Sequence, residues 1–93
     1  MVKGTTKSGF KFEIDERVIR DKGFLDVLIK AKKATDEMEM FEVTNELYEF
    51  VLKGKGLAAL EKHIRKNNDG FCDAEVLANE FNEILSSVSA AKK

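Results

Sequence analysis

The sequence predicts a mainly α-helical protein, with about five helices in a compact bundle and a small N-terminal β-hairpin over about residues 2–14. Three observations predict this fold. The 93 residues are 43% hydrophobic and 35% charged and include no proline, which favours a helix-rich folded domain over a disordered chain. Apolar residues alternate near the N-terminus and recur at helical spacing after it. The length fits one domain over residues 1–88, and we expect a flexible tail over residues 89–93.

The hairpin is predicted from residues 7–15, which read KSGFKFEID. The Ser-Gly dipeptide provides a two-residue turn. Phe10, Phe12 and Ile14 alternate with charged residues, so they would share one face of a strand. Because an isolated hairpin is marginal in water, we expect this face to pack against helices.

The helices are predicted from apolar spacing and from their start and stop signals. Asp15, Asp36 and Asp73 are expected to cap helix N-termini. Gly23 is expected to separate the first two helices and Gly54 to end the third. The expected helices cover residues 16–19, 24–34, 37–53, 57–67 and 74–88.

The helix over residues 37–53 carries two adjacent apolar stripes, which make an unusually broad apolar surface. This breadth predicts a central helix that contributes to the core. The first stripe is Met40, Val43, Leu47 and Phe50, and the second is Met38, Phe41, Tyr48 and Val51.

Charge is segregated along the chain, although the net charge is −1. Residues 1–33 carry nine basic and five acidic groups, residues 34–52 carry six acidic and no basic groups, and residues 53–67 carry five basic groups and one acidic group. Such blocks are typical of oppositely charged elements packed side by side, and a partner-binding face is the alternative. The candidate partner surface consists of Lys55, Lys62, Arg65, Lys66, Glu39, Glu42, Glu46, Glu49 and Phe71.

Phe71 follows a glycine-containing turn between two amphipathic helices, so its side chain can be placed in two ways. A large aromatic residue in such a place is usually buried in the core. The alternative is a side chain that projects as an anchor for a partner.

No catalytic, metal or cofactor site is expected. Cys72 and His63 are the only soft metal ligands, whereas structural zinc requires four. A lone cysteine and a lone histidine are more often structural than a catalytic pair. No apolar run approaches the roughly 20 residues that span a membrane, and one cysteine cannot form an internal disulfide. A cytoplasmic location is therefore expected.

Three short segments follow one another in a familiar order: SGFKFEID at residues 8–15, GKGLAALEKHIR at 54–65, and NDG followed by DAE within 68–75. Over about residues 8–86 this order resembles the small tail assembly chaperones of long, non-contractile-tailed phages. The segment RDKGF at 20–24 departs from the resemblance, because the family often has an Asp-Asp-Trp run there.

The resemblance implies a non-enzymatic protein that binds the tape measure protein during tail assembly, with the tail tube protein and self-association as further candidate interactions. It also implies action in the cytoplasm of the host bacterium and absence from the mature virion. The alternative is a small phage or bacterial regulator that binds nucleic acid through the basic segment 53–66. Nucleic-acid binding is less favoured, because the last helix is acidic and phosphate would repel it.

Overall fold

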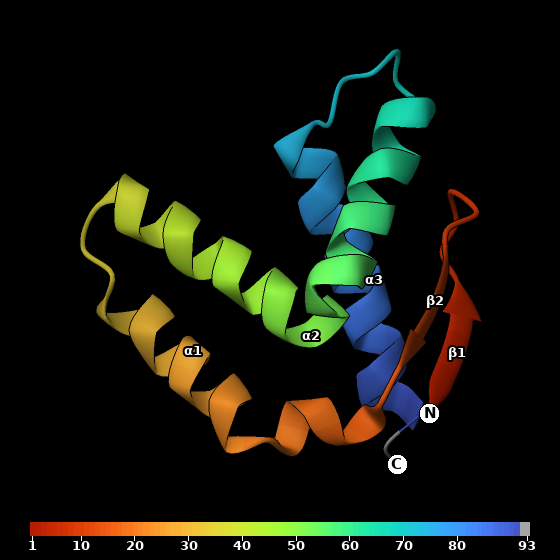
Figure 1. Cartoon of the computed structure of the whole chain (residues 1–93). Coiled ribbons are helices and arrows are strands. Elements are labelled where there is room, and N and C mark those ends of the chain that lie inside the picture. Colours follow the sequence, from red (N-terminus) through yellow and green to blue (C-terminus); the bar gives the residue numbers. More distant parts are fainter. Residues whose placement is uncertain (92–93) are drawn as a thin grey trace.

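The structure is a computed structural model that describes residues 1–91. It is mainly helical, with a two-stranded antiparallel sheet at the N-terminus, as predicted (Figure 1). The expected count of about five helices is wrong, because residues 1–91 form three α-helices and one short 3-10 helix. The elements are β1 (Val2–Thr5), β2 (Lys11–Ile14), η1 (Glu16–Arg20), α1 (Lys22–Lys33), α2 (Glu37–Lys66) and α3 (Ala74–Ala91).

Two features account for the lower helix count. The first expected helix is the 3-10 helix η1, which Asp15 caps as predicted by accepting a hydrogen bond from the Arg17 N–H at 2.9 Å. The third and fourth expected helices are joined into α2 across a kink at Lys53, where φ is 64° and ψ is 164°. Gly54, the predicted end of the third helix, lies inside α2. The break therefore falls on a residue with a side chain, where positive φ is unfavourable.

The hairpin pairs Val2 with Ile14 at its open end, as one antiparallel ladder. Its turn contains three residues, not the expected two. The Thr6 N–H donates to the Phe10 carbonyl at 2.9 Å, and the Gly9 N–H donates to the Thr6 carbonyl at 2.9 Å. Gly9 has a φ of 96°, which suits the left-handed last residue of a three-residue hairpin loop.

The predicted apolar face of the hairpin packs on the helices. Phe12 and Ile14 are buried, and Phe10 is half-buried beside the His63 ring, with 5.5 Å between ring centroids. The core that receives them lies among the hairpin, η1, the second part of α2 and α3. Its buried members are Phe12, Ile14, Val18, Tyr48, Val51, Leu52, Leu57, Leu60, Ile64, Phe81, Ile84 and Val88. We call the hairpin, η1, α2 from Tyr48 onward and α3 the body.

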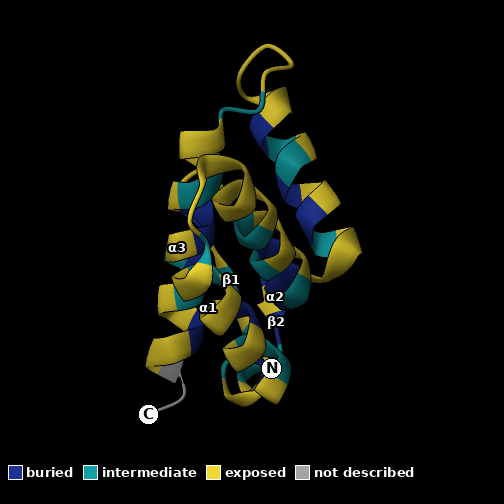
Figure 2. Cartoon of the chain, turned by 90° about the vertical axis from the view of Figure 1, so that its left-hand side faces the viewer, coloured by how far each residue is buried: buried dark blue, intermediate teal, exposed yellow. Residues whose placement is uncertain are grey.

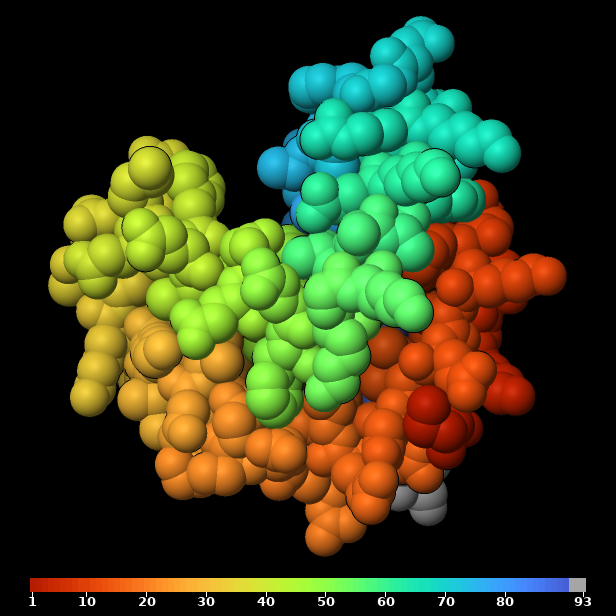
Figure 3. Space-filling model, in the orientation of Figure 1, coloured from red at the N-terminus to blue at the C-terminus, as the bar shows by residue number. Residues whose placement is uncertain are grey.

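The remaining helical residues form a projecting helical hairpin, which we call the arm and define as residues 22–47. Figure 1 shows α1 running alongside the first half of α2, away from α3, and Figure 3 shows a notch between the arm and the turn that joins α2 to α3. Within the arm, Val27 is buried but lies outside the main core cluster. Phe24 and Leu47 pack against that cluster and connect the arm to the body, and the two helices of the arm also contact each other.

Gly23 lies in the first turn of α1, so the prediction that it separates two helices is wrong. Asp21 caps α1 instead, and its carboxylate accepts a hydrogen bond from the Gly23 N–H at 2.7 Å. A Cβ atom at Gly23 would lie 2.7 Å from the ring of Phe50. The glycine is therefore needed for the close approach of α1 to α2.

The C-terminal part of the chain is more helical than expected. α3 continues to Ala91, so residues 89–91 of the predicted tail are helical, and residues 92–93 lie outside the described residues. Among residues 1–91, no helix combines the length and apolar character that crossing a membrane requires.

Candidate functional site

Exposed apolar side chains gather on the arm. Six of the nine large hydrophobic side chains that are exposed in residues 1–91 belong to it. Figure 2, which views the molecule from the side of the arm, shows long exposed stretches along α1. Large exposed apolar patches on a protein commonly mark sites of interaction. The six residues are Leu25, Leu28, Ile29, Met38, Met40 and Phe41.

The second apolar stripe of α2 explains part of this exposure, because it extends beyond the core. Val51 and Tyr48 are 2% and 8% exposed, and the Tyr48 ring packs on Phe81 of α3 with 4.6 Å between centroids. Further toward the N-terminus of α2, Phe41 and Met38 are 59% and 67% exposed. The prediction that this stripe belongs to the core is correct for its C-terminal half and wrong for its N-terminal half.

The two helices of the arm turn apolar side chains to the same side. An ion pair between Lys30 and Glu46, at 2.9 Å, marks one side of the arm. Successive helical residues are about 100° apart, so Leu28 lies about 200° from Lys30, and Phe41 lies about 140° from Glu46. Both side chains therefore point away from the ion pair, as Leu25 does by the same reasoning.

We call this side the apolar face of the arm: Leu25, Leu28 and Phe41, with Ile29 and Met38 at its outer edges. Tyr48 lies about 200° from Glu46 and so points to the same side. Because Tyr48 contacts α3, the apolar face adjoins the body at one end and is uncovered toward the tip of the arm.

The predicted acidic residues form one exposed stripe on the first half of α2, with the spacing i, i+3, i+7 and i+10. Three of the four have polar partners within residues 1–91. Glu46 pairs with Lys30, Glu39 accepts a hydrogen bond from the Thr35 hydroxyl at 3.3 Å, and Glu49 accepts one from the Asn45 amide at 3.0 Å. Glu42 completes the stripe.

The predicted basic residues lie on the second half of α2, beyond the kink. Lys55, Lys62 and Lys66 are exposed and follow one helical stripe, with Arg65 beside it. The kink at Lys53 separates them from the acidic stripe. The structure therefore places the predicted charged residues on two surfaces rather than one.

Phe71 is 61% exposed, so the interpretation of this residue as part of the core is wrong. It lies in the turn between α2 and α3, where Arg65 Nη1 donates to the Gly70 carbonyl at 3.0 Å. This bond ties the turn to the end of the basic stripe. Asp73 then caps α3 as predicted, accepting from the Glu75 N–H at 2.8 Å.

A buried carboxylate fixes the hairpin loop to the helices. Glu80 is 7% exposed, and its Oε1 accepts hydrogen bonds from the hydroxyls of Thr6 and Ser8, both at 2.8 Å. Ser8 Oγ also lies 3.1 Å from Nε2 of His63. A serine beside a histidine suggests a nucleophile, but this hydroxyl donates its proton to Glu80. The arrangement joins the hairpin loop, α2 and α3.

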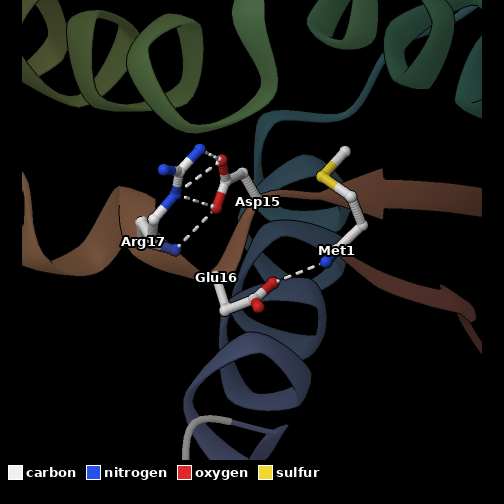
Figure 4. Close-up of polar contacts among 4 residues, drawn as sticks. All are labelled: Met1, Asp15, Glu16 and Arg17. Carbon is white, nitrogen blue, oxygen red and sulfur yellow. Dashed lines mark hydrogen bonds and ion pairs between the residues drawn. The ribbon is translucent and has the colours of Figure 1, made fainter.

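A cleft of about 720 Å³ lies between η1 and the kink of α2, and two of its lining side chains, Asp15 and Arg17, are paired with each other. Asp15 receives hydrogen bonds from the Arg17 guanidinium, and the Met1 ammonium contacts Glu16 at 2.8 Å (Figure 4). The bond from Arg17 holds the pKa of Asp15 well below its usual range, and the bond from the N-terminus lowers the pKa of Glu16. These contacts fix the start of η1.

Sequence reasoning missed the apolar face of the arm. It assigned Phe41 to the core, because Phe41 recurs at helical spacing with Tyr48 and Val51, which are buried. The breadth of the two stripes on α2 was the available signal, since one neighbouring helix cannot cover so wide a surface. Within residues 1–91, no group of His, Cys, Asp and Glu is arranged to hold a metal ion.

Comparison with known proteins identifies no relative. No protein-family model, curated protein or solved structure matches the chain. The function must therefore be inferred from these surfaces, together with the resemblance carried by the three sequence segments.

Proposed function

We propose that this chain is a non-enzymatic assembly chaperone that binds amphipathic helices through the apolar face of the arm. The observation that carries the proposal is the second stripe of α2, which is buried at Val51 and Tyr48 and exposed at Phe41 and Met38. Apolar residues at helical spacing on a solvent-facing surface suit the docking of a helix, whose own apolar side is then removed from water.

The resemblance to tail assembly chaperones supplies the proposed client, the tape measure protein, with the tail tube protein as a further candidate. A long helical client with apolar stripes needs to be covered until tail tubes form around it. In this proposal the chaperone acts in the host cytoplasm and leaves before the virion is complete. Its detection in purified virions, in amounts comparable to the tape measure protein, would contradict that last step.

The test is co-purification with the tape measure protein from the genome that encodes this chain, using the double variant Leu28→Ser/Phe41→Ser. We expect at least a tenfold loss of captured tape measure protein, because both replacements remove apolar area from the centre of the apolar face. Val76→Ser is the matched control, since it removes an exposed apolar side chain of α3 outside the arm. Full capture by the arm variant would exclude this surface.

The basic stripe and Phe71 give a second candidate surface. Charge reversal at Lys62, Arg65 and Lys66 should weaken capture of the client if this surface contributes; unchanged capture would remove it. The same exposed lysines with an exposed aromatic ring at their end also favour nucleic-acid binding as the alternative function. A gel-shift titration separates the two, because binding to phosphates must weaken steeply as salt rises.

A further inference from the structure

The apolar face of the arm lies between a basic edge and an acidic edge. α1 contains four lysines and one aspartate, whereas residues 37–52 contain five glutamates and no basic residue. Lys32 follows Leu28 by one helical turn, and Glu37 precedes Phe41 by one turn, so both charges border the apolar face. The two edges therefore carry opposite charge.

The two edge residues are Lys32 and Glu37. Both are exposed, and the ion pairs of the arm within residues 1–91 involve other side chains, Lys22 with Asp26 and Lys30 with Glu46. Lys33 and Glu42 lie on the opposite side of the arm, where they line one pocket together with Lys30 and Glu46.

We propose that the apolar face receives a single amphipathic helix whose apolar stripe has acidic residues on the flank beside α1 and basic residues on the flank beside α2. This inference rests on the proposed function and adds the charge pattern of the client. A helix that is acidic or basic on both flanks would meet like charge along one edge of the arm.

A single helix fits this surface better than a second copy of the whole chain. Two neighbouring helices leave a groove between them, and the side-chain ridge of a third helix can fill it. α3 lies on the same side of α2 as the apolar face, as the contact between Tyr48 and Phe81 shows. The body of a second copy would meet α3 there, whereas a lone helix can lie beside it.

The test uses three synthetic helical peptides of about 18 residues, long enough to form helices. They share one apolar stripe and differ in their flanks, which are both acidic, both basic, or one of each. Binding to the full chain is measured by fluorescence anisotropy at low salt. We expect the mixed peptide to bind about 3- to 10-fold more tightly than the others, in the range of a few surface ion pairs. Equal affinities would overturn the inference.

Two variants of the chain should switch this preference. Lys32→Glu makes both edges acidic and should favour the peptide with two basic flanks. Glu37→Lys makes both edges basic and should favour the peptide with two acidic flanks. The ranking does not depend on the direction in which the peptide lies, because turning the peptide end to end only exchanges its flanks. An unchanged ranking in both variants would overturn the inference.

The matched control is Lys11→Glu, which makes the same change in net charge as Lys32→Glu at an exposed residue of β2, outside both the arm and the basic stripe. It should keep the wild-type ranking; a switch as large as that of the arm variant would show that net charge, rather than the edges of the arm, selects the peptide. All replaced side chains are exposed, and circular dichroism checks that each variant is folded.

The charge pattern and the proposed function can fail separately. If the tape measure protein is captured through the arm but the peptides bind equally, the charge pattern is wrong and the function stands. If the peptides show the expected ranking but the tape measure protein is not captured, the identity of the client is wrong and the charge pattern stands.

Discussion

The body and the arm are both built from amphipathic helices, yet they differ in what covers their apolar side chains. In the body, Leu60, Ile84 and Val88 have no exposed surface. In the arm, Val27 is buried, but Leu25 and Phe41 are half exposed or more. The body therefore covers its own apolar stripes, and the arm carries apolar surface beyond what its own packing uses.

α2 takes part in both regions. The change from exposed to buried apolar side chains occurs along one stripe of this helix, between Phe41 and Tyr48. Residues that hold the fold and residues available for binding are thus separated in the sequence by about two helical turns. Variants that affect one property should leave the other nearly unchanged, and this separation can be tested directly.

The largest effect is expected for Ile84→Ala in the body. Truncation of a fully buried isoleucine leaves a cavity and should lower the free energy of unfolding by about 3 kcal/mol. Leu28→Ala in the arm is the comparison. Because Leu28 is 41% exposed, its truncation should lower the free energy of unfolding by less than about 1 kcal/mol. Urea denaturation followed by circular dichroism measures both. Equal losses would show that the arm is as closely packed as the body.

A smaller effect is expected for Glu80→Ala, which removes the acceptor shared by Thr6 and Ser8. Removing this acceptor from the buried Thr6 hydroxyl should cost about 1–3 kcal/mol. Glu80→Gln is the control, since its amide oxygen can still accept both bonds. If Ala and Gln are equally stable, these bonds do not hold the hairpin loop on the body.

A substitution at the kink is expected to stabilise the protein, whereas the two preceding substitutions destabilise it. Lys53→Gly should raise the free energy of unfolding by about 1 kcal/mol, because glycine accepts positive φ without a steric cost. Lys55→Gly, two residues further on and inside the regular helix, should lower it by about 1 kcal/mol. A destabilised Lys53→Gly variant would contradict the backbone geometry at the junction of arm and body.

The smallest effect concerns the pH dependence of stability at the start of η1. The pKa of Asp15 is lower in the folded chain than its ordinary value, so its contribution is present at neutral pH and is lost as pH falls through the acid range. Asp15→Asn should be less stable than wild type at neutral pH, and the difference should shrink toward pH 2 or so. Thermal midpoints across this range measure it; a difference independent of pH would contradict the ionised contact with Arg17.

Much of the body could be predicted from the sequence because its signals are local. The alternation ending at Ile14 predicted the hairpin strand, and Asp15, Asp36 and Asp73 cap helices as expected. These features depend on residues a few positions apart. The three-residue turn was less predictable, because Ser-Gly suits a two-residue turn as well.

The arm could not be predicted from periodicity, since the same spacing describes a buried stripe and an exposed one. Whether Phe41 is covered depends on the position of α3 in the folded chain, and tertiary packing sets that position. The third helix was expected to end at Gly54, whereas the chain kinks at Lys53 and α2 continues, because packing of both halves of α2 overrides the preference of a single residue. The exposure of Phe71 could not be decided for the same reason, because its position between two amphipathic helices in the sequence does not show what covers it in the folded chain.

The bond between Thr6 and Glu80 joins residues from opposite ends of the chain, and this has a consequence for folding during synthesis. The contacts between the two helices of the arm are local in sequence, so this helical hairpin can form as soon as residue 47 has left the ribosome, whereas the body must wait for α3. In that interval Tyr48 and Val51 have no α3 to cover them. We therefore expect the nascent chain to present a longer apolar stripe than the finished protein, and completion of α3 to shorten it.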